Sequence, residues 1–275
     1  MIGFARQNRL FSFAVVFVAL QVLLAVFAPA LGLQDPYAQI MVQRLKGPSP
    51  VNWLGTDQLG RDILSRIIYG YRTSLLTCVT AVILSLLAGG TLGMLAAYYR
   101  GWFDRIVMRL MDVLFAFPIL LLAIAVIAVL GPSIWGAAIA IAIVYTPIFS
   151  RLLRGPALVI CESEYVTGAK AIGAGDMRII FLHLLPNLAS VVLVQTSLLL
   201  SAAILVEASL SFLGLGAQPP TPSLGLMLSE GRNFLLLAPW PAIFAGFAIL
   251  FLSFGFNLLG DALRDTLDPR LRKES

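Results

Sequence analysis

The chain has 275 residues, of which 59% are hydrophobic and only 12% are charged. Soluble domains of this size carry about a quarter charged residues, so the composition excludes an ordinary soluble protein. Several uncharged apolar runs are long enough to cross a bilayer, which indicates a polytopic membrane protein. The net charge of +5 does not indicate nucleic-acid binding, because no basic cluster is interleaved with stacking aromatic residues. Two cysteines and a single histidine predict neither a disulfide framework nor a bound metal.

The first apolar run extends from Leu10 to Gln34, after Arg6 and Arg9. Basic residues, an apolar stretch and the sequence Ala28-Pro29-Ala30 also resemble a cleaved signal peptide. The run is longer than a usual signal core, however. We therefore predict that residues 1–34 contain the N-terminal tail and transmembrane helix 1.

Residues 35–72 form the longest predicted external segment. Prolines in its first half predict an extended loop. In its second half an apolar stripe predicts an amphipathic helix that lies in the membrane interface or packs across the ends of the spans. The stripe consists of Ile63, Leu64, Ile67 and Ile68.

Five further spans are predicted in a core over residues 73–261. They are Thr73–Tyr99, two spans within Val113–Ser150 separated by Gly131-Pro132-Ser133, about Pro186–Leu213, and about Pro239–Asp261. Six spans place both termini on one side, and thirteen of the 19 Lys and Arg residues fall on that side. The positive-inside rule then predicts a cytoplasmic N-terminus and a cytoplasmic tail over residues 262–275.

A polar stretch from Glu162 to Asn187 interrupts the apolar sequence. Val166, Ala169 and Ile172 recur every three residues, which predicts one apolar face of a short helix. Gly173 and Gly175 then predict the helix end and a tight turn. The turn after the helix requires a positive φ or a close backbone approach. Pro186 is expected in the first turn of the next span.

The sequence lacks the motifs of a catalytic protein. It has no phosphate-binding loop, no Gly-x-Ser-x-Gly elbow and no paired histidines on a helix. His183 is read as an interfacial or capping residue rather than a general base. An integral membrane enzyme would gather its titratable residues, and a secondary transporter would show internal repeats and broken helices; neither pattern is evident.

Two features inside the spans leave alternatives open. Glu207 lies in an apolar run, about 32 Å along span 5 from Pro186, and an ionisable group there marks a cavity or pathway by default. It either lines the path or pairs with Arg232 or an arginine of the first loop. The small residues Gly89, Gly90 and Gly93 form a close-packing face. That face packs within this chain or against a second membrane chain.

Three stretches resemble the C-type permease subunit of the dipeptide, oligopeptide and nickel group of binding-protein-dependent ABC importers. The first is Asn52–Arg72, similar to Trp-x-Gly-Thr-Asp-x-x-Gly-Arg-Asp. The second is the polar stretch, similar to a cytoplasmic loop with Glu-Ala-Ala, three residues and Gly. The third runs from Phe256 to Arg270. The chain departs from the pattern at Thr167-Gly168-Ala169, which stands in place of Glu-Ala-Ala, and also at Leu224 and Ala245.

The resemblance implies an all-α, type I permease fold with six transmembrane helices, in a bacterial or archaeal cytoplasmic membrane. It implies four partners: a B-type permease, two ATP-binding subunits and an extracytoplasmic solute-binding protein. ATP and magnesium would bind the ATPase subunits, and this chain would bind no cofactor. The expected substrate is a peptide, with nickel or a chelated metal as the alternative.

The resemblance also assigns residues to these contacts. Coupling helices are expected at about residues 161–184. The ATPase-coupling candidates are Glu162, Glu164, Tyr165, Val166, Ala169, Lys170, Ile172 and Gly173. Of these, Val166, Ala169 and Ile172 suit the docked face, and Glu162, Glu164 and Lys170 suit its rim. The binding-protein contact candidates are Trp53, Asp57, Arg61 and Asp62.

Overall fold

The computed structural model describes residues 9–267. Within these residues the secondary structure is helical apart from one isolated bridge between Thr56 and Asp62. The α-helices are α2 (Arg9–Val26), α3 (Ile63–Ser85), α4 (Thr91–Tyr99), α5 (Gly101–Phe115), α6 (Ile119–Leu130), α7 (Ile134–Cys161), α8 (Glu164–Ala171), α9 (Asp176–Ile179), α10 (Leu185–Phe212), α11 (Leu224–Arg232) and α12 (Trp240–Leu267). Two π-helical turns, η3 (Leu86–Gly90) and η4 (Ile180–Leu184), join α3 to α4 and α9 to α10.

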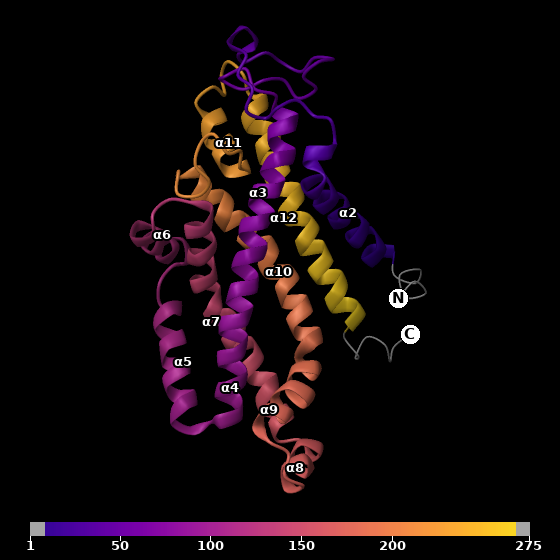
Figure 1. Ribbon diagram of the computed structural model, residues 1–275, viewed down its shortest axis with the longest axis vertical. Helices are drawn as coiled ribbons and strands as arrows, with labels where there is room; N and C mark the ends of the chain where they lie inside the picture. Colours follow the sequence, from indigo (N-terminus) through magenta and orange to yellow (C-terminus); the bar gives the residue numbers. More distant parts are fainter. Residues whose placement is uncertain (1–8, 268–275) are drawn as a thin grey trace.

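The helices form an elongated bundle with two distinct ends (Figure 1). One end carries the segment between α2 and α3, together with α11, and is called the loop end. The opposite end carries α8 and the turn between α4 and α5, and is called the α8 end (Figure 1). Consecutive long helices run in alternating directions between the two ends, as a polytopic chain requires.

Among residues 9–267, five helical segments are long and apolar enough to cross a membrane, and a bent pair makes a sixth. The bent pair is α5 and α6, whose axes meet at 95°. The break falls at Pro118, which precedes α6 and cannot continue a helix from α5. The predicted boundary at Gly131-Pro132-Ser133 is confirmed, because Ser133 caps α7 by accepting a hydrogen bond from the Gly136 amide at 2.9 Å.

The amphipathic helix expected before residue 73 is not a separate element. Ile63 begins α3, and the helix continues through η3 to Tyr99 over 37 residues, or about 55 Å. No proline interrupts the sequence between Ile63 and Tyr99, so the helix has no reason to end at Arg72. The apolar stripe, with Ile63 and Ile67 buried, therefore packs into the bundle core instead of lying flat in the interface.

The small-residue face of this long helix packs against α7 of the same chain. A Cβ atom added to Gly89 would lie 2.1 Å from the carbonyl oxygen of Thr146. One added to Gly93 would lie 2.2 Å from the carbonyl oxygen of Ser150. The two helix backbones thus touch at these glycines. Of the two alternatives left open by the sequence, packing within the chain is the one observed.

Candidate functional site

The short helix α8 lies at the tip of the α8 end (Figure 1). It ends with two hydrogen bonds, from the Gly173 amide to the Lys170 carbonyl and from the Ala174 amide to the Ala169 carbonyl, both 3.0 Å long. This pair of bonds is the Schellman motif, which needs a left-handed residue after the helix. Gly173 supplies it with φ +87°. The predicted need for a positive φ is confirmed at Gly173, whereas Gly175 has an ordinary φ of −70°.

The inner face of α8 is covered by the chain itself. Val166 is fully buried, in a cluster that includes Cys161, Leu184 and Leu188. Ile172, six residues later, is 88% exposed. The three-residue spacing predicted that Val166 and Ile172 lie on one docking face. This prediction is wrong, because one side chain is buried and the other is exposed. The spacing did not reveal that Val166 packs in a cluster with side chains of α7, η4 and α10.

Three polar contacts hold α8 and its flanks to neighbouring helices. The Lys170 ammonium lies 4.6 Å from the centre of the Tyr98 ring on α4, a cation–π contact. The Asn187 amide of α10 donates to the Tyr165 hydroxyl at 3.4 Å. Glu162, just before α8, forms an ion pair with Arg100 at 2.9 Å.

Sequence reasoning missed the partners of these residues. Arg100 adopts φ +53° in the turn between α4 and α5, a region that long side chains rarely occupy. The Tyr98 hydroxyl in turn donates to Asp176 of α9 at 2.7 Å. Tyr98 and Arg100 lie more than sixty residues before α8 in the chain, so no local pattern could pair them with it. Their aromatic and basic character was the only signal.

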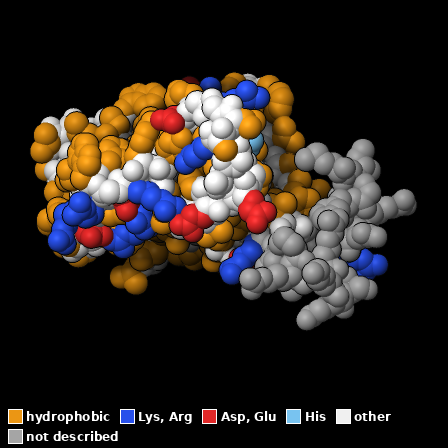
Figure 2. All heavy atoms as spheres, turned by 90° about the horizontal axis from the view of Figure 1, so that it is seen from below, with side chains coloured by type: hydrophobic (Ala, Val, Ile, Leu, Met, Phe, Trp, Pro, Cys, Tyr) orange, Lys and Arg blue, Asp and Glu red, His pale blue; other side chains and the backbone are white. Residues whose placement is uncertain are grey.

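The outer face of α8 is open. Glu164, Gly168, Ala171 and Ile172 are all exposed, and a Cβ atom at Gly168 would meet nothing within 4 Å. Figure 2 looks onto this end and shows polar and charged side chains standing out from apolar surroundings. Beside Ile172 lies a hollow of about 230 Å³, which Arg178 and His183 also line. A partner protein could therefore contact α8 along this face.

Glu207 lies deep in the bundle. Its side chain is 1% exposed, and its Oε1 accepts a hydrogen bond from the Ser211 hydroxyl at 2.7 Å. Its Oε2 has no hydrogen-bond partner among residues 9–267. Arg232 does not pair with Glu207. Its guanidinium lies over the Phe212 ring instead, 4.7 Å from the ring centre. In this conformation Glu207 thus lies inside the chain, and among residues 9–267 it forms an ion pair neither with Arg232 nor with an arginine of the first loop.

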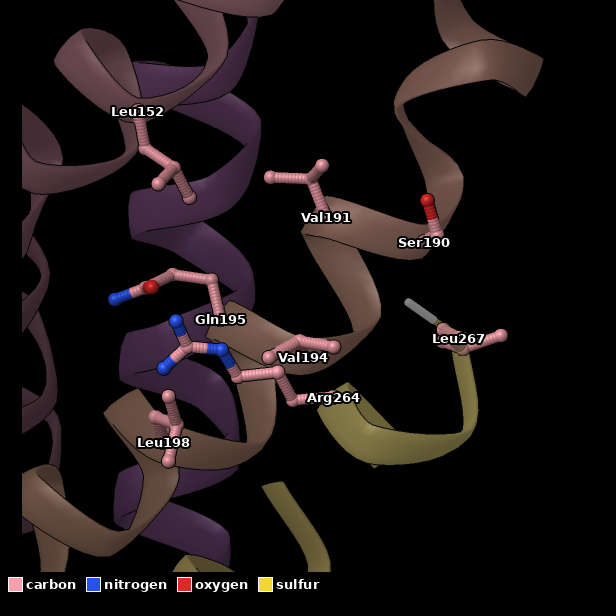
Figure 3. Close-up of a pocket in the computed structure, with 8 residues that line it drawn as sticks. All are labelled: Leu152, Ser190, Val191, Val194, Gln195, Leu198, Arg264 and Leu267. Carbon is pink, nitrogen blue, oxygen red and sulfur yellow. The ribbon is translucent and has the colours of Figure 1, made fainter. Parts of the chain in front are cut away.

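A larger groove of about 450 Å³ opens between α7, α10 and α12. It is lined by Leu152, Ser190, Val191, Val194, Gln195, Leu198, Arg264 and Leu267. Figure 3 shows the Gln195 amide and the Arg264 guanidinium next to each other and pointing the same way. Both groups donate hydrogen bonds, so this groove could contact a carboxylate or a carbonyl oxygen.

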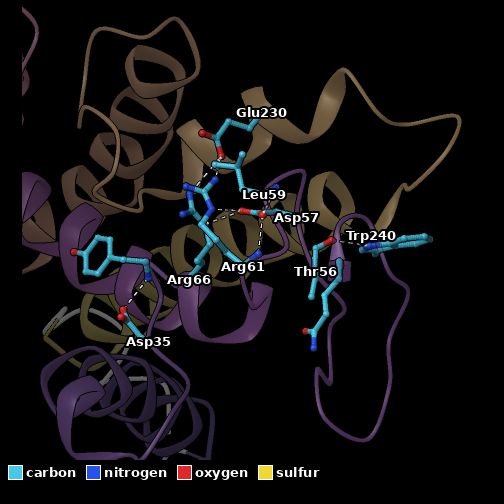
Figure 4. Close-up of polar contacts among 10 residues, drawn as sticks. Asp35, Thr56, Asp57, Leu59, Arg61, Arg66, Glu230 and Trp240 are labelled. Carbon is cyan, nitrogen blue, oxygen red and sulfur yellow. Dashed lines mark hydrogen bonds and ion pairs between the residues drawn. The ribbon is translucent and has the colours of Figure 1, made fainter. Parts of the chain in front are cut away.

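A buried charge cluster holds the loop end together (Figure 4). The Asp57 carboxylate accepts from the Arg61 guanidinium at 2.6 Å and from the Leu59 and Arg61 amides. Glu230 of α11 pairs with Arg61 at 3.0 Å and with Arg66 of α3 at 3.4 Å. Two carboxylates and two guanidiniums thus join the long loop to α3 and α11. The role of Arg66 and Glu230 was not predicted from the sequence.

Most of the predicted binding-protein contacts are buried. Asp57, Arg61 and Asp62 are 4%, 2% and 6% exposed. Asp62 caps α3 by accepting from the Ser65 amide at 2.8 Å, so these charges stabilise the loop and cannot reach a partner here. Trp53 is 70% exposed and is the only one of the four candidates open to a contact.

Metal ligation has no obvious place in the described chain. Across residues 9–267, no three His, Cys, Asp or Glu side chains gather closely enough to hold a metal ion.

Comparison with known proteins agrees with this architecture. The family described as "Binding-protein-dependent transport system inner membrane component" matches residues 89–273. A dipeptide transport system permease protein, DppC, from Alkalihalophilus pseudofirmus is 47% identical over 97% of this chain and 88% of its own length. A glutathione transport system permease protein, GsiD, from Pectobacterium atrosepticum is 48% identical over 93% of this chain and 85% of its own.

A solved structure shares the fold at low sequence identity. It is the MetNI methionine ABC transporter in inward-facing conformations, with a TM-score of 0.60 and 16% identity. The match covers 75% of this chain and 98% of that chain. The fold, the apolar helices and the sequence similarity agree, and the chain belongs to the family of inner-membrane permease components of binding-protein-dependent transport systems.

Proposed function

We propose that the chain is one of two permease subunits of an ATP-driven importer of di- or oligopeptides. The observation that carries the proposal is the identity of 47–48% along nearly the whole chain to permeases named for dipeptide and glutathione transport. Both of those named substrates are peptides or peptide-like. The second permease subunit would be a B-type chain, and the pathway would lie between the two permeases in a bacterial or archaeal cytoplasmic membrane.

ATP and magnesium would bind to two separate ATPase subunits. These subunits would contact the α8 end, and we place that end in the cytoplasm. We assign the outer face of α8, with Glu164, Gly168, Ala171 and Ile172, to the ATPase contact. The inner face supports this role, because Val166 and the contacts of Lys170 and Tyr165 attach α8 to α4 and α10. A push on α8 would therefore move those helices with it, which couples ATP-driven closure to the pathway.

A solute-binding protein would dock at the loop end. Its contacts would be the exposed apolar side chains of the loop rather than the buried charges. Trp53 is 70% exposed, Val42 is 84% exposed and Val51 is 69% exposed. The charge cluster beneath them would transmit the contact to α11, which packs against α10 and α12.

The test is transport by the reconstituted assembly of both permeases, both ATPase subunits and the binding protein in proteoliposomes. We expect ATP-dependent accumulation of labelled di- or tripeptides that unlabelled peptide suppresses. Glutathione and Ni²⁺ serve as competing substrates. Accumulation of Ni²⁺ without peptide would contradict the proposed substrate, and accumulation without ATP would contradict the importer class.

A further inference from the structure

An apolar groove lies between α2, α3 and α12, away from both candidate contact surfaces. It has a volume of about 510 Å³, within the range of sites that bind small molecules. Seven apolar side chains and one cation line it, namely Val22, Ala25, Val26, Arg72, Leu75, Leu76, Val79 and Phe256. Figure 1 shows α2 inclined to α3 and α12 on the outside of the bundle.

Arg72 is the exceptional lining residue. Its side chain is exposed, and no hydrogen bond or ion pair in the described part of the chain involves it. The arginines nearest to it on the loop side, Arg61 and Arg66, are buried and paired with Asp57 and Glu230. A guanidinium beside apolar side chains and without an acidic partner is a candidate site for an anionic group.

The geometry places Arg72 at the edge of the hydrocarbon core. The 18 residues of α2 extend about 27 Å, close to the thickness of that core, so Val26 marks its boundary at the loop end. Arg72 lines the same groove as Ala25 and Val26, and its long side chain can extend from there to the lipid phosphates just outside this boundary. Leu75 and Val79 lie one and two helical turns deeper, where acyl chains run.

We propose that this groove binds one anionic phospholipid, with its phosphate on Arg72 and an acyl chain along Leu75, Leu76 and Val79. A guanidinium matches a phosphate in charge and presents a fork of donors to its oxygens. Phe256 of α12 also lines the groove. The lipid would fill the space between α2 and the rest of the bundle, and its binding does not depend on the transported substrate.

The test compares lipid retention by the purified transporter complex. Complexes are extracted from membranes, and phosphatidylglycerol and phosphatidylethanolamine that remain bound are quantified by mass spectrometry. We expect Arg72→Gln to lower retained phosphatidylglycerol about fivefold, the effect of one basic residue on an anionic headgroup. Arg72→Lys should retain most of it. Val79→Trp should lower it while Arg72 is intact, because the indole fills the groove.

Arg109→Gln is the matched control. Arg109 is also exposed and without a hydrogen bond or ion pair among residues 9–267, but it lines none of the grooves described above. Phosphatidylglycerol retention unchanged in both Arg72→Gln and Val79→Trp would overturn the proposal. An equal loss in Arg109→Gln would overturn it too.

Discussion

Gly173 acts through its backbone alone. It has φ +87°, and no atom lies within 4 Å of a Cβ placed on it. A side chain there would meet no steric obstacle but would be held in the left-handed region, which costs an L-residue about 1–2 kcal/mol. The two hydrogen bonds that end α8 depend on this conformation. The direction in which the chain leaves α8 toward α9 is thus set by one residue.

We expect Gly173→Val to uncouple ATP hydrolysis from uptake, because the strained turn would shift α8 relative to α9 and α10. Gly175→Ala is the matched control, since Gly175 has φ −70° and equally open surroundings. Uptake and binding-protein-stimulated ATPase activity are measured in proteoliposomes. Equal coupling in the two variants would show that the turn does not need the left-handed conformation.

Glu207 gives a second prediction at this scale. Glu207→Gln should assemble normally and keep its thermal stability to within about 1 kcal/mol, because the Gln carbonyl can also accept from Ser211. Uptake should also be retained, since the carboxylate is 1% exposed. Glu207→Leu should lower the melting temperature by leaving the Ser211 hydroxyl without this acceptor. A stable Glu207→Gln complex with impaired uptake would instead assign the charge to the pathway in another conformation.

At the scale of helices, α8 has two faces with different partners. Val166 packs inward, and Ile172 points outward with 88% of its surface exposed. A helix of eight residues is too short to be stable alone in water. Its inner face must therefore pack on α10 and η4 before the outer face can serve a partner.

We predict that Ile172→Asp weakens capture of the ATPase subunits and leaves the melting temperature of the permease unchanged. Val166→Ala should leave capture of the ATPase subunits unchanged. It should lower the free energy of unfolding by about 1–2 kcal/mol, because two buried methyl groups are lost. Affinity capture and thermal unfolding are measured for both variants. Loss of capture in Val166→Ala alone would mean that the docking face is the one first predicted from the spacing.

The contact between the long α3–α4 helix and α7 is another property of elements. At Gly93 a methyl group would lie 2.2 Å from the Ser150 carbonyl, so the helices would have to separate. We expect Gly93→Ala to destabilise the chain by about 1–3 kcal/mol. Gly155→Ala on α7 is the control and should be neutral or stabilising, because its surroundings are open. Similar melting temperatures for the two variants would contradict the close approach.

At the scale of the whole molecule, the charge cluster connects segments far apart in the chain. Arg61 and Glu230 are 169 positions apart and lie 3.0 Å from each other. The Trp240 indole adds a hydrogen bond to the Thr56 carbonyl at 3.2 Å. The long loop is therefore anchored both to α11 and to the start of α12, so a partner bound to the loop acts on the helices that follow α10.

Asp57→Asn should unfold the loop locally and cost about 3–5 kcal/mol, because it removes a carboxylate from a buried ion pair and leaves the guanidiniums without that partner. Asp112→Asn is the control, because its pair with Arg151 is exposed and should contribute less than about 1 kcal/mol. Thermal unfolding and hydrogen exchange over residues 40–62 give the readout. Equal exchange in the two variants would contradict an anchoring role.

The membrane class, the break between α6 and α7 and the turn after α8 could be predicted from the sequence alone. Each depends on local chemistry: the length of an uncharged run, the proline and serine at residues 132 and 133, and the glycine at 173. These signals act over a few residues, so they can be read along the chain. The resemblance to the permease family also came from ordered local motifs.

Which surfaces are free could be learned only from the folded molecule. Val166 and Ile172 share an apolar pattern, yet Val166 is buried in a cluster with side chains of α7, η4 and α10, and Ile172 is exposed. Asp57 and Arg61 look like surface charges in a loop, yet Glu230 and Arg66 enclose them. Burial depends on residues contributed by distant segments, and a one-dimensional pattern carries no information on which segment will cover a given side chain.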